Sequence, residues 1–348
     1  MRRILVPGVI AVLLAPFLLQ AAVGIYFGYN VSNGVRNLMP TLTGRYLVYQ
    51  QPVERQETSP RADYRTVTWR GELESEALRE ASGLAVSPQS DRLFYSINDS
   101  GNEPVLFALD DRGGHTGSWR LAYDGFHDFE DLASFSLDGR AYILVADTGD
   151  NFRWRNDLKL LVFPEPDATQ TEVVLEAAWI IPFTYPEGYR DCEAVAVDEA
   201  AGEILLVSKG HVPAEVFRLP LRPETSAIQV AEPIARLGQL PQPTLRDLRE
   251  DPVWGDYRST PTALDVRGNQ AVVVTYRDAY LYSRAPGRDW AETFRSRPAR
   301  VALPKIDGLE SGALTRSGQQ LLLVGERPEG IDRMGVYLVD LAPAPDQG

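Results

Sequence analysis

Apolar and polar residues alternate in short blocks along most of the chain. From residue 64 onward, short apolar runs are separated by turns that carry Gly, Asp, Asn or Pro. Runs of this kind are typical of β-strands, and no long stretch has the periodicity of an amphipathic helix. The pattern therefore predicts an all-β domain over residues 64–342, followed by a short tail at 343–348.

The apolar runs repeat. In five segments a small or acidic residue precedes a strand, a tight turn follows, and a more apolar strand returns. The segments are separated by 48, 63, 69 and 49 residues and start at Ser82, Glu130, Glu193, Thr262 and Ser311. Four strands per unit at this period indicate the blades of a β-propeller. We predict five blades, with six as the alternative, because the two longer intervals could contain a degenerate blade.

The last unit ends before its fourth strand, whereas an unassigned strand at residues 65–70 precedes the first unit. Pairing that strand with the last blade would close the ring and remove the exposed sheet edges. The N-terminal strand is therefore expected in the same sheet as the C-terminal ones.

The first thirty residues form a separate unit. Arg2 and Arg3 precede an uncharged apolar run over residues 4–27. Such a run is long enough to cross a bilayer, and the two arginines favour a cytoplasmic N-terminus. We predict one transmembrane helix within residues 1–30 and a linker at 31–63. The alternative is a cleaved signal peptide and a secreted protein.

Net charge and cysteine content limit the expected partners and the expected role of the thiol. The chain has 35 Lys and Arg against 48 Asp and Glu, hence a net charge of −13. An acidic surface repels phosphates, so nucleic acid is not an expected partner. The single cysteine, Cys192, cannot form an intramolecular disulfide, and the flanking Asp191 and Glu193 favour a buried structural thiol over a nucleophile.

The propeller topology predicts which residues meet at one mouth of the axial channel. The first strand of each blade lines the channel, and the second strand returns to the face where the first began. Residues just before the first strand and residues just after the second strand therefore meet around one channel mouth. Those before the first strands are Glu80 and Ser82, Asp128 and Glu130, Asp191 and Glu193, Thr260 and Thr262, and Glu310 and Ser311.

Carboxylates that converge on a narrow axis repel one another unless they are protonated or bridged by a cation. A hard ion with oxygen ligands, most simply Ca²⁺, would relieve the repulsion. The predicted metal ligands are Ser82, Glu130, Glu193, Thr262 and Glu310, although Glu310 departs from the common spacing by one residue. The alternative is that these acids cap strand ends or form ion pairs between blades.

Residues after the second strands suggest an anionic substrate. Lys209 and Arg277 each follow a strongly apolar strand, and beside a bound cation they could neutralise charge in a transition state. Asp128 or Asp191 would then be the general base. The predicted substrate-binding residues are Asn98, Asp99, Asp147, Asn151 and Arg327. The acids and amides in the Gly-bearing segments could instead satisfy turn backbone.

Seven short motifs carry a resemblance to known proteins. They are ASGL at 81–84, NDSG at 98–101, FEDLA at 129–133, DTGDN at 147–151, YPEG at 185–188, DCEA at 191–194 and SK at 208–209. Together they resemble a largely uncharacterised family of bacterial extracytoplasmic propeller proteins over about residues 75–327. In a bacterium this implies an inner-membrane anchor and a periplasmic propeller.

The set at the blade starts also looks like the central calcium site of the five-bladed calcium-dependent nucleotidases (apyrases). More loosely, it is similar to lactonase and phytase-type propellers. The apyrase resemblance implies a calcium-bound water that attacks a phosphoanhydride, but likeness of fold does not transfer function.

The sequence thus supports two hypotheses from different classes. The first is a membrane-anchored, calcium-dependent hydrolase of a small anionic phosphoester or phosphoanhydride. The second is a non-catalytic scaffold with a structural ion, which would bind a partner protein over its top face through loops such as residues 239–259.

Overall fold

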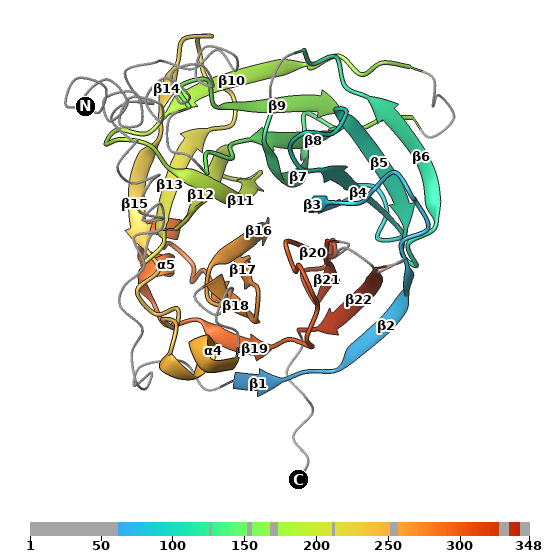
Figure 1. Ribbon diagram of the computed structural model, residues 1–348. Helices are drawn as coiled ribbons and strands as arrows, with labels where there is room; N and C mark the ends of the chain where they lie inside the picture. The colour runs from blue at the N-terminus through green and yellow to red at the C-terminus, as the bar shows by residue number, and fades with distance from the viewer. Residues whose placement is uncertain are drawn as a thin grey trace, which may run out of the picture.

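The computed structural model describes residues 62–124, 127–151, 155–167, 173–210, 213–250, 257–326 and 334–341. Their strands form five sheets arranged as blades around one axis, each built on four antiparallel strands (Figure 1). The predicted anchor at 1–30, the tail at 343–348 and the linker up to residue 61 lie outside the described residues. Within the described part of the chain, no helix has the length and apolar character needed to cross a membrane.

The five blades follow one another along the chain. Blade 1 comprises β3 (Ala81–Val86), β4 (Leu93–Asn98), β5 (Val105–Asp110) and β6 (His115–Arg120). Blade 2 comprises β7 (Phe129–Leu137), β8 (Arg140–Asp147), β9 (Lys159–Pro164) and β10 (Trp179–Thr184). Blade 3 comprises β11 (Asp191–Asp198), β12 (Glu203–Lys209), β13 (Glu215–Pro220) and β15 (Glu232–Arg236). Blade 4 comprises β16 (Pro261–Arg267), β17 (Gln270–Thr275), β18 (Asp278–Ser283) and β19 (Ala299–Ala302).

Blade 5 closes the ring as predicted. It contains β20 (Ser311–Leu314), β21 (Gln320–Val324), β22 (Gly335–Asp340) and, as its outer strand, β2 (Val67–Glu72). The N-terminal strand β2 pairs antiparallel with β22, with Val67 opposite Val339. Backbone hydrogen bonds between β2 and β22 thus join the N-terminal strand to the last blade. This confirms the five-bladed closed ring.

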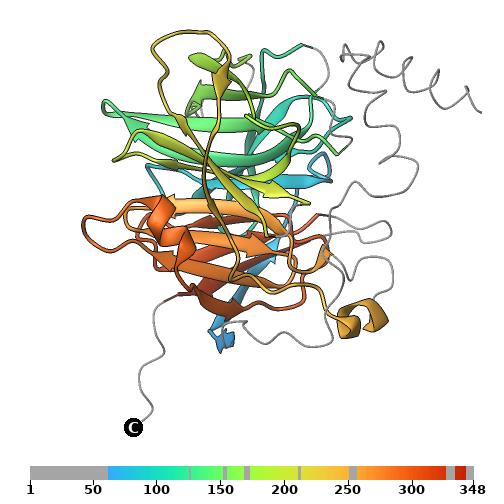
Figure 2. The same ribbon diagram turned by 90° about the vertical axis from the view of Figure 1, so that its left-hand side faces the viewer.

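Five blades, not six, account for the long intervals. The additional length forms short elements that the sequence pattern did not predict. In the interval between Glu193 and Thr262, the two-residue strand β14 (Gln229–Val230) pairs in parallel with β10. Before blade 1, the short strand β1 (Ala62–Tyr64) pairs in parallel with β19. The six-residue helix α4 (Leu245–Glu250) occupies part of the loop before β16 and projects from one face of the ring (Figure 2). Elements this short carry no detectable periodicity.

A second short helix, α5 (Trp290–Arg295), joins β18 to β19. Asp289 caps its N-terminus by accepting a hydrogen bond from the backbone N–H of Glu292 at 2.8 Å. Trp290 and Phe294 are buried against the outer strands of blades 3 and 4. The helix therefore fills the space between these two blades at the rim.

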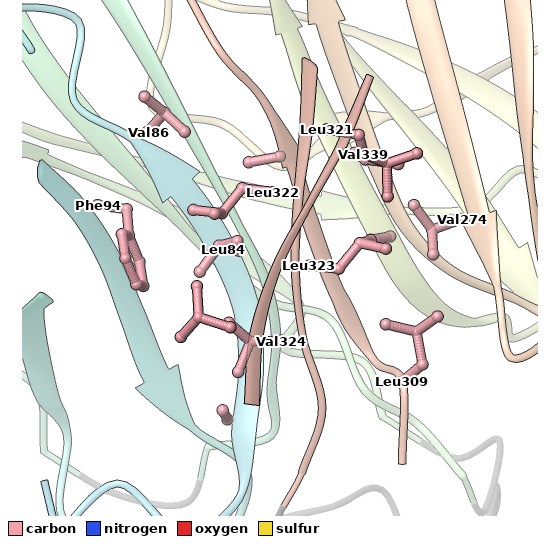
Figure 3. Close-up of a cluster of buried hydrophobic side chains, with 14 of the residues drawn as sticks. Leu84, Val86, Phe94, Val274, Leu309, Leu321, Leu322, Leu323, Val324 and Val339 are labelled. Atoms are coloured by element: carbon pink, nitrogen blue, oxygen red, sulfur yellow. The ribbon is translucent and has the colours of Figure 1, made fainter. Parts of the chain in front are cut away.

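Apolar side chains pack between neighbouring blades. In Figure 3, Leu84, Val86 and Phe94 of blade 1 lie next to the β21 residues 321–324 of blade 5. Every residue of β3 is buried, because both faces of an inner strand meet a neighbouring blade. This explains why the strands read as continuous apolar runs. Burying one such side chain contributes about 1.5–3 kcal/mol.

Buried carboxylates also connect the inner strands. Asp131 on β7 accepts hydrogen bonds from Val195 N at 2.7 Å and Leu264 N at 3.4 Å, on the next two blades. Asp265 on β16 accepts one from Leu314 N of blade 5 at 2.8 Å. Both side chains are buried, and burial raises their pKa above the ordinary value. These contacts fix how the blades sit around the axis.

Candidate cation site at the channel mouth

Four inner strands carry a β-bulge near their start. The strand register shifts between Ser82 and Leu84, between Phe129 and Asp131, between Cys192 and Ala194, and between Pro261 and Ala263. The extra residues are therefore Gly83, Glu130, Glu193 and Thr262, and the last three are predicted metal ligands. A bulge re-aims a side chain and often lies beside a functional site.

The two bulged glutamates lie in one cluster of carboxylates. Asp99, Asp128 and Glu130 each offer a carboxylate oxygen within 4.8 Å of the others, and so do Glu130, Asp191 and Glu193. Glu130 belongs to both groups. The four acids from the blade starts are buried, and Asp99 comes from the loop after β4. The structure thus brings together residues at or just before the start of first strands and one that follows a second strand.

Burial and mutual repulsion disfavour ionisation of these acids. Burial raises the pKa of Glu130 well above its usual range, and Asp99, Asp128 and Asp191 add to the shift. Burial, with Asp99 and Asp191, raises the pKa of Asp128 to about 7. Burial, with Glu310, raises the pKa of Glu326 to about 9. A bound cation would favour the ionised form of all three.

Lys209 supplies one positive charge inside this cluster. Its Nζ donates to Glu193 Oε1, and its side chain is 11% exposed. Burial lowers the pKa of Lys209, but the carboxylates of Asp191, Glu310 and Glu130 outweigh it and leave the pKa raised. One ammonium group does not balance five carboxylates, so the cluster still has an excess of negative charge.

Blade 4 contributes Tyr276 beside the cluster, a residue that the sequence analysis missed, through the predicted ligand Glu310, which is not one of the five clustered acids. The Tyr276 hydroxyl donates to Glu310 Oε1. Tyr276 has the position in blade 4 that Lys209 has in blade 3. Each lies two residues after the strand residue that pairs with Ala263 or Ala194, the residue that follows the bulge. The apolar run alone does not reveal this strand pairing.

Arg277, the next residue, is directed elsewhere. Its guanidinium donates to Asp247 Oδ1 on α4, which also lies 3.5 Å from Arg258. Tyr276 and Arg277 form the bend between β17 and β18, and their side chains contact different partners, Glu310 and Asp247. The predicted pair of Lys209 and Arg277 is therefore not brought together.

The predicted hydroxyl ligands differ in their contacts. Ser82 Oγ donates to the backbone carbonyl of Glu130 at 2.8 Å, and Ser311 Oγ donates to that of Val324 at 2.8 Å. Thr262 is fully buried, and among the described residues its Oγ1 has no hydrogen-bond partner. Thr262 occupies the same bulge position as Glu130 and Glu193, so its hydroxyl remains available to a ligand.

The predicted substrate-binding residues are dispersed. Asn98 Oδ1 accepts from Arg79 N at 2.9 Å, and its Nδ2 donates to Ala77 O at 2.8 Å, so its amide supports a turn. Asn151 is exposed, and Arg327 lies outside the described residues. Asp99 is the member of this set that the carboxylate cluster contains.

Asp147 does not belong to the carboxylate cluster but holds the backbone beside it. It accepts hydrogen bonds from Asp128 N at 3.0 Å and the Tyr123 hydroxyl at 2.6 Å, and pairs with the buried Arg155 at 2.7 Å. Arg155 also donates to Gly149 O at 2.8 Å. The loop after β8 is thereby held against the acids.

Gly149 shows how close this approach is. A Cβ atom at residue 149 would clash with Glu130 Oε1 and would lie 2.5 Å from Asp128 Oδ2. Only glycine lets the backbone pass here without displacing the two carboxylates.

Comparisons with known proteins do not assign the chain to a family. No family model and no curated protein match it. Among solved structures, a luciferin-regenerating enzyme is 8% identical, with 79% of this chain and 95% of that chain covered and a TM-score of 0.41. A nidogen/laminin complex is 13% identical, with 76% and 77% covered and a TM-score of 0.40.

The Pan2 WD40 domain of Neurospora crassa is 12% identical, with 84% of this chain and 98% of that chain covered and a TM-score of 0.40. Likeness at this level carries no inference about activity, ligand or partner. The functional conclusions below therefore depend on the geometry of the site itself.

Proposed function

We propose that the channel mouth binds a divalent cation and that the protein is a cation-dependent hydrolase of a small anionic phosphoester or phosphoanhydride. The observation that carries the proposal is the set of five acids around Glu130 whose carboxylate oxygens lie within 4.8 Å in two overlapping groups. Ca²⁺ is the expected ion, because its ligands are hard oxygens in flexible number.

The residues present fit such an ion in kind and in charge. Carboxylates of Glu130 and Glu193 would hold it, and the buried Thr262 hydroxyl, which lacks a partner among the described residues, would add a neutral oxygen. Lys209 already neutralises part of Glu193. The remaining negative charge is what a divalent cation would balance.

The protein's own groups have distinct roles in this proposal. The bound ion would polarise a phosphoryl oxygen and lower the pKa of a water molecule. Asp128 or Asp191 would accept the proton of the attacking water, and Asp191 is oriented for this by the Asp150 N–H at 2.8 Å. Lys209 would stabilise charge on the leaving phosphate. Arg277 has no part, because it is bound to Asp247.

Thermal unfolding after chelation, followed by titration with Ca²⁺, tests the cation site. An ion that binds only the folded state adds about 2.7 kcal/mol at 100 times its Kd. We expect a saturable stabilisation in the wild type that the double variant E130Q/E193Q lacks. An equal response in both would contradict the site. Hydrolysis of phosphoesters and nucleotides by the wild type but not by the double variant would support the enzymatic step.

One observation favours the second candidate, a non-catalytic scaffold with a structural ion. Both basic residues expected to bind substrate are engaged within the protein, Lys209 with Glu193 and Arg277 with Asp247 on the projecting helix α4. The R277A variant would leave Arg258 as the basic partner of Asp247 and alter this face without removing an acid of the cluster. A cation-stabilised protein that hydrolyses no tested phosphoester would support the scaffold.

Residues 1–30 are proposed to anchor this propeller in a bacterial inner membrane with the channel on the periplasmic side. The apolar run and the preceding arginines support the proposal. Protease added to spheroplasts should digest the propeller while the bilayer stays intact. Protection of the propeller under these conditions would contradict the topology.

A further inference from the structure

A pocket of about 550 Å³ lies at the opposite ends of the inner strands. Its wall includes Ser134 and Ser136 from β7, Arg267 from the end of β16, and Arg316 from the turn after β20. A strand rises about 3.3 Å per residue, so Ser136 lies about 20 Å along β7 from Glu130. The pocket and the channel mouth are therefore separate sites at the two ends of the same inner strands.

Arg267 reaches across the axis to another blade. Its Nη1 donates to Ser134 O at 3.1 Å, and its Nη2 donates to Ser134 Oγ at 2.9 Å. Its side chain is 15% exposed, with Asp265 Oδ1 at 3.3 Å. Asp265 is itself engaged by the N–H groups of Val266 and Leu314. A guanidinium held in this way loses little freedom when it binds a ligand.

Arg316 adds a second guanidinium to the same pocket. Its backbone N–H donates to Asp91 Oδ1 at 2.7 Å, which fixes the turn, and its Nη1 lies 3.4 Å from the carbonyl of Gln89. Across the described ranges, no carboxylate forms an ion pair with this side chain. Its charge is thus available to a ligand.

The acids in the wall have their own donors. Asp198 Oδ2 accepts from Arg284 at 2.6 Å and from Trp290 Nε1 at 2.7 Å. Glu199 Oε1 accepts from Ser136 N at 2.8 Å. Arg284 thus balances Asp198, and Asp265 lies beside Arg267. The guanidinium that has no carboxylate of its own among the described residues is that of Arg316.

We propose that this pocket binds a small organic anion, whose carboxylate or phosphate group contacts the guanidiniums of Arg267 and Arg316. Guanidinium forks match the geometry of both oxyanions. The volume is typical of a metabolite site and exceeds what a single oxyanion fills, so the rest of the ligand extends along the Ser134 and Ser136 side of the wall. The inference does not depend on cation binding at the channel mouth.

Calorimetric titration of the full-length protein in chelator-containing buffer tests the proposal, with inorganic phosphate and succinate as separate probes and glycerol as a neutral control. Chelation removes any cation that could hold the probes at the acidic mouth. We expect saturable binding of at least one charged probe and none of glycerol. Which probe binds more tightly distinguishes a phosphate ligand from a carboxylate ligand.

Three variants locate the binding. R316A should weaken it about tenfold or more, because a charge-assisted hydrogen bond is lost, while R288A, an exposed arginine outside the pocket, should not. R267K keeps the positive charge but lacks the two Nη groups of the guanidinium, so it should weaken binding. It replaces R267A as the test if R267A does not fold. E130Q/E193Q should bind the probes as the wild type does. Absence of saturable binding at millimolar probe, or equal affinity in R316A and wild type, would overturn the proposal.

Discussion

Glu130 and Glu193 are the extra residues of matching β-bulges in neighbouring blades, and their carboxylates belong to one cluster. The strand register of the two sheets therefore places these two like charges close together. Their proximity is costly for the folded state unless a proton, Lys209 or a cation compensates. The first prediction follows from this relationship.

The E130Q variant should change stability in opposite directions with and without a divalent cation. In chelator at neutral pH, removing one buried acid relieves repulsion and should raise the free energy of unfolding by about 1 kcal/mol. The stabilisation by added Ca²⁺ should be lost, because a ligand is removed. Chemical denaturation with and without Ca²⁺ measures both. E76Q, at an exposed position, is the control, and a loss of stability in chelator would argue against repulsion at Glu130.

Removing the ammonium group of Lys209 should destabilise the protein in chelator, the opposite of the effect expected for E130Q. K209M leaves Glu193 without its ion-pair partner and should lower the free energy of unfolding by about 3 kcal/mol in chelator. Added Ca²⁺ should then stabilise the variant more than the wild type, because more negative charge is left to balance. K305M is the matched control, since Lys305 is 91% exposed. An unchanged response to Ca²⁺ would show that Lys209 and the cation act at separate places.

A single methyl group at residue 149 should disturb the cation site. In G149A the new Cβ must displace the carboxylates of Glu130 and Asp128, so the affinity for Ca²⁺ should fall about tenfold. Isothermal titration of the two proteins measures the change. G238A is the control, because nothing lies within 4 Å of a Cβ at that residue. Equal affinities would mean that the loop after β8 does not approach the ion.

The buried Asp265 should make stability depend on pH. Burial raises its pKa in the folded state above the ordinary value of 3.8. Between these two pKa values the folded state holds more protons than the unfolded state, so its contribution to stability is present at low pH and declines as pH rises.

Urea unfolding of the wild type and D265N between about pH 4 and pH 8 measures this contribution. The difference in free energy, wild type minus variant, should become less favourable to the wild type with increasing pH. Parallel curves for the two proteins would contradict a raised pKa at Asp265. The loss of one acceptor for Val266 or Leu314 in D265N shifts the whole curve but not its slope.

The repeat and its chemistry could be predicted because both are local in the chain. Short apolar runs, turn residues and acids directly before strands determine the five blades, the closing role of residues 65–70 and the positions of Glu130 and Glu193. An inner strand must bury both faces, so its composition alone reveals it.

What only the tertiary structure decided depends on register and on contacts between distant residues. The register places Tyr276 rather than Arg277 beside the carboxylate cluster, and a contact with α4 directs Arg277 to Asp247. Arg267 meets Ser134 across 133 residues of sequence, at a pocket for which the pattern gave no signal. A bulge or a shift of one residue turns a side chain to the opposite face of a strand, and such shifts are set by the packing of whole blades.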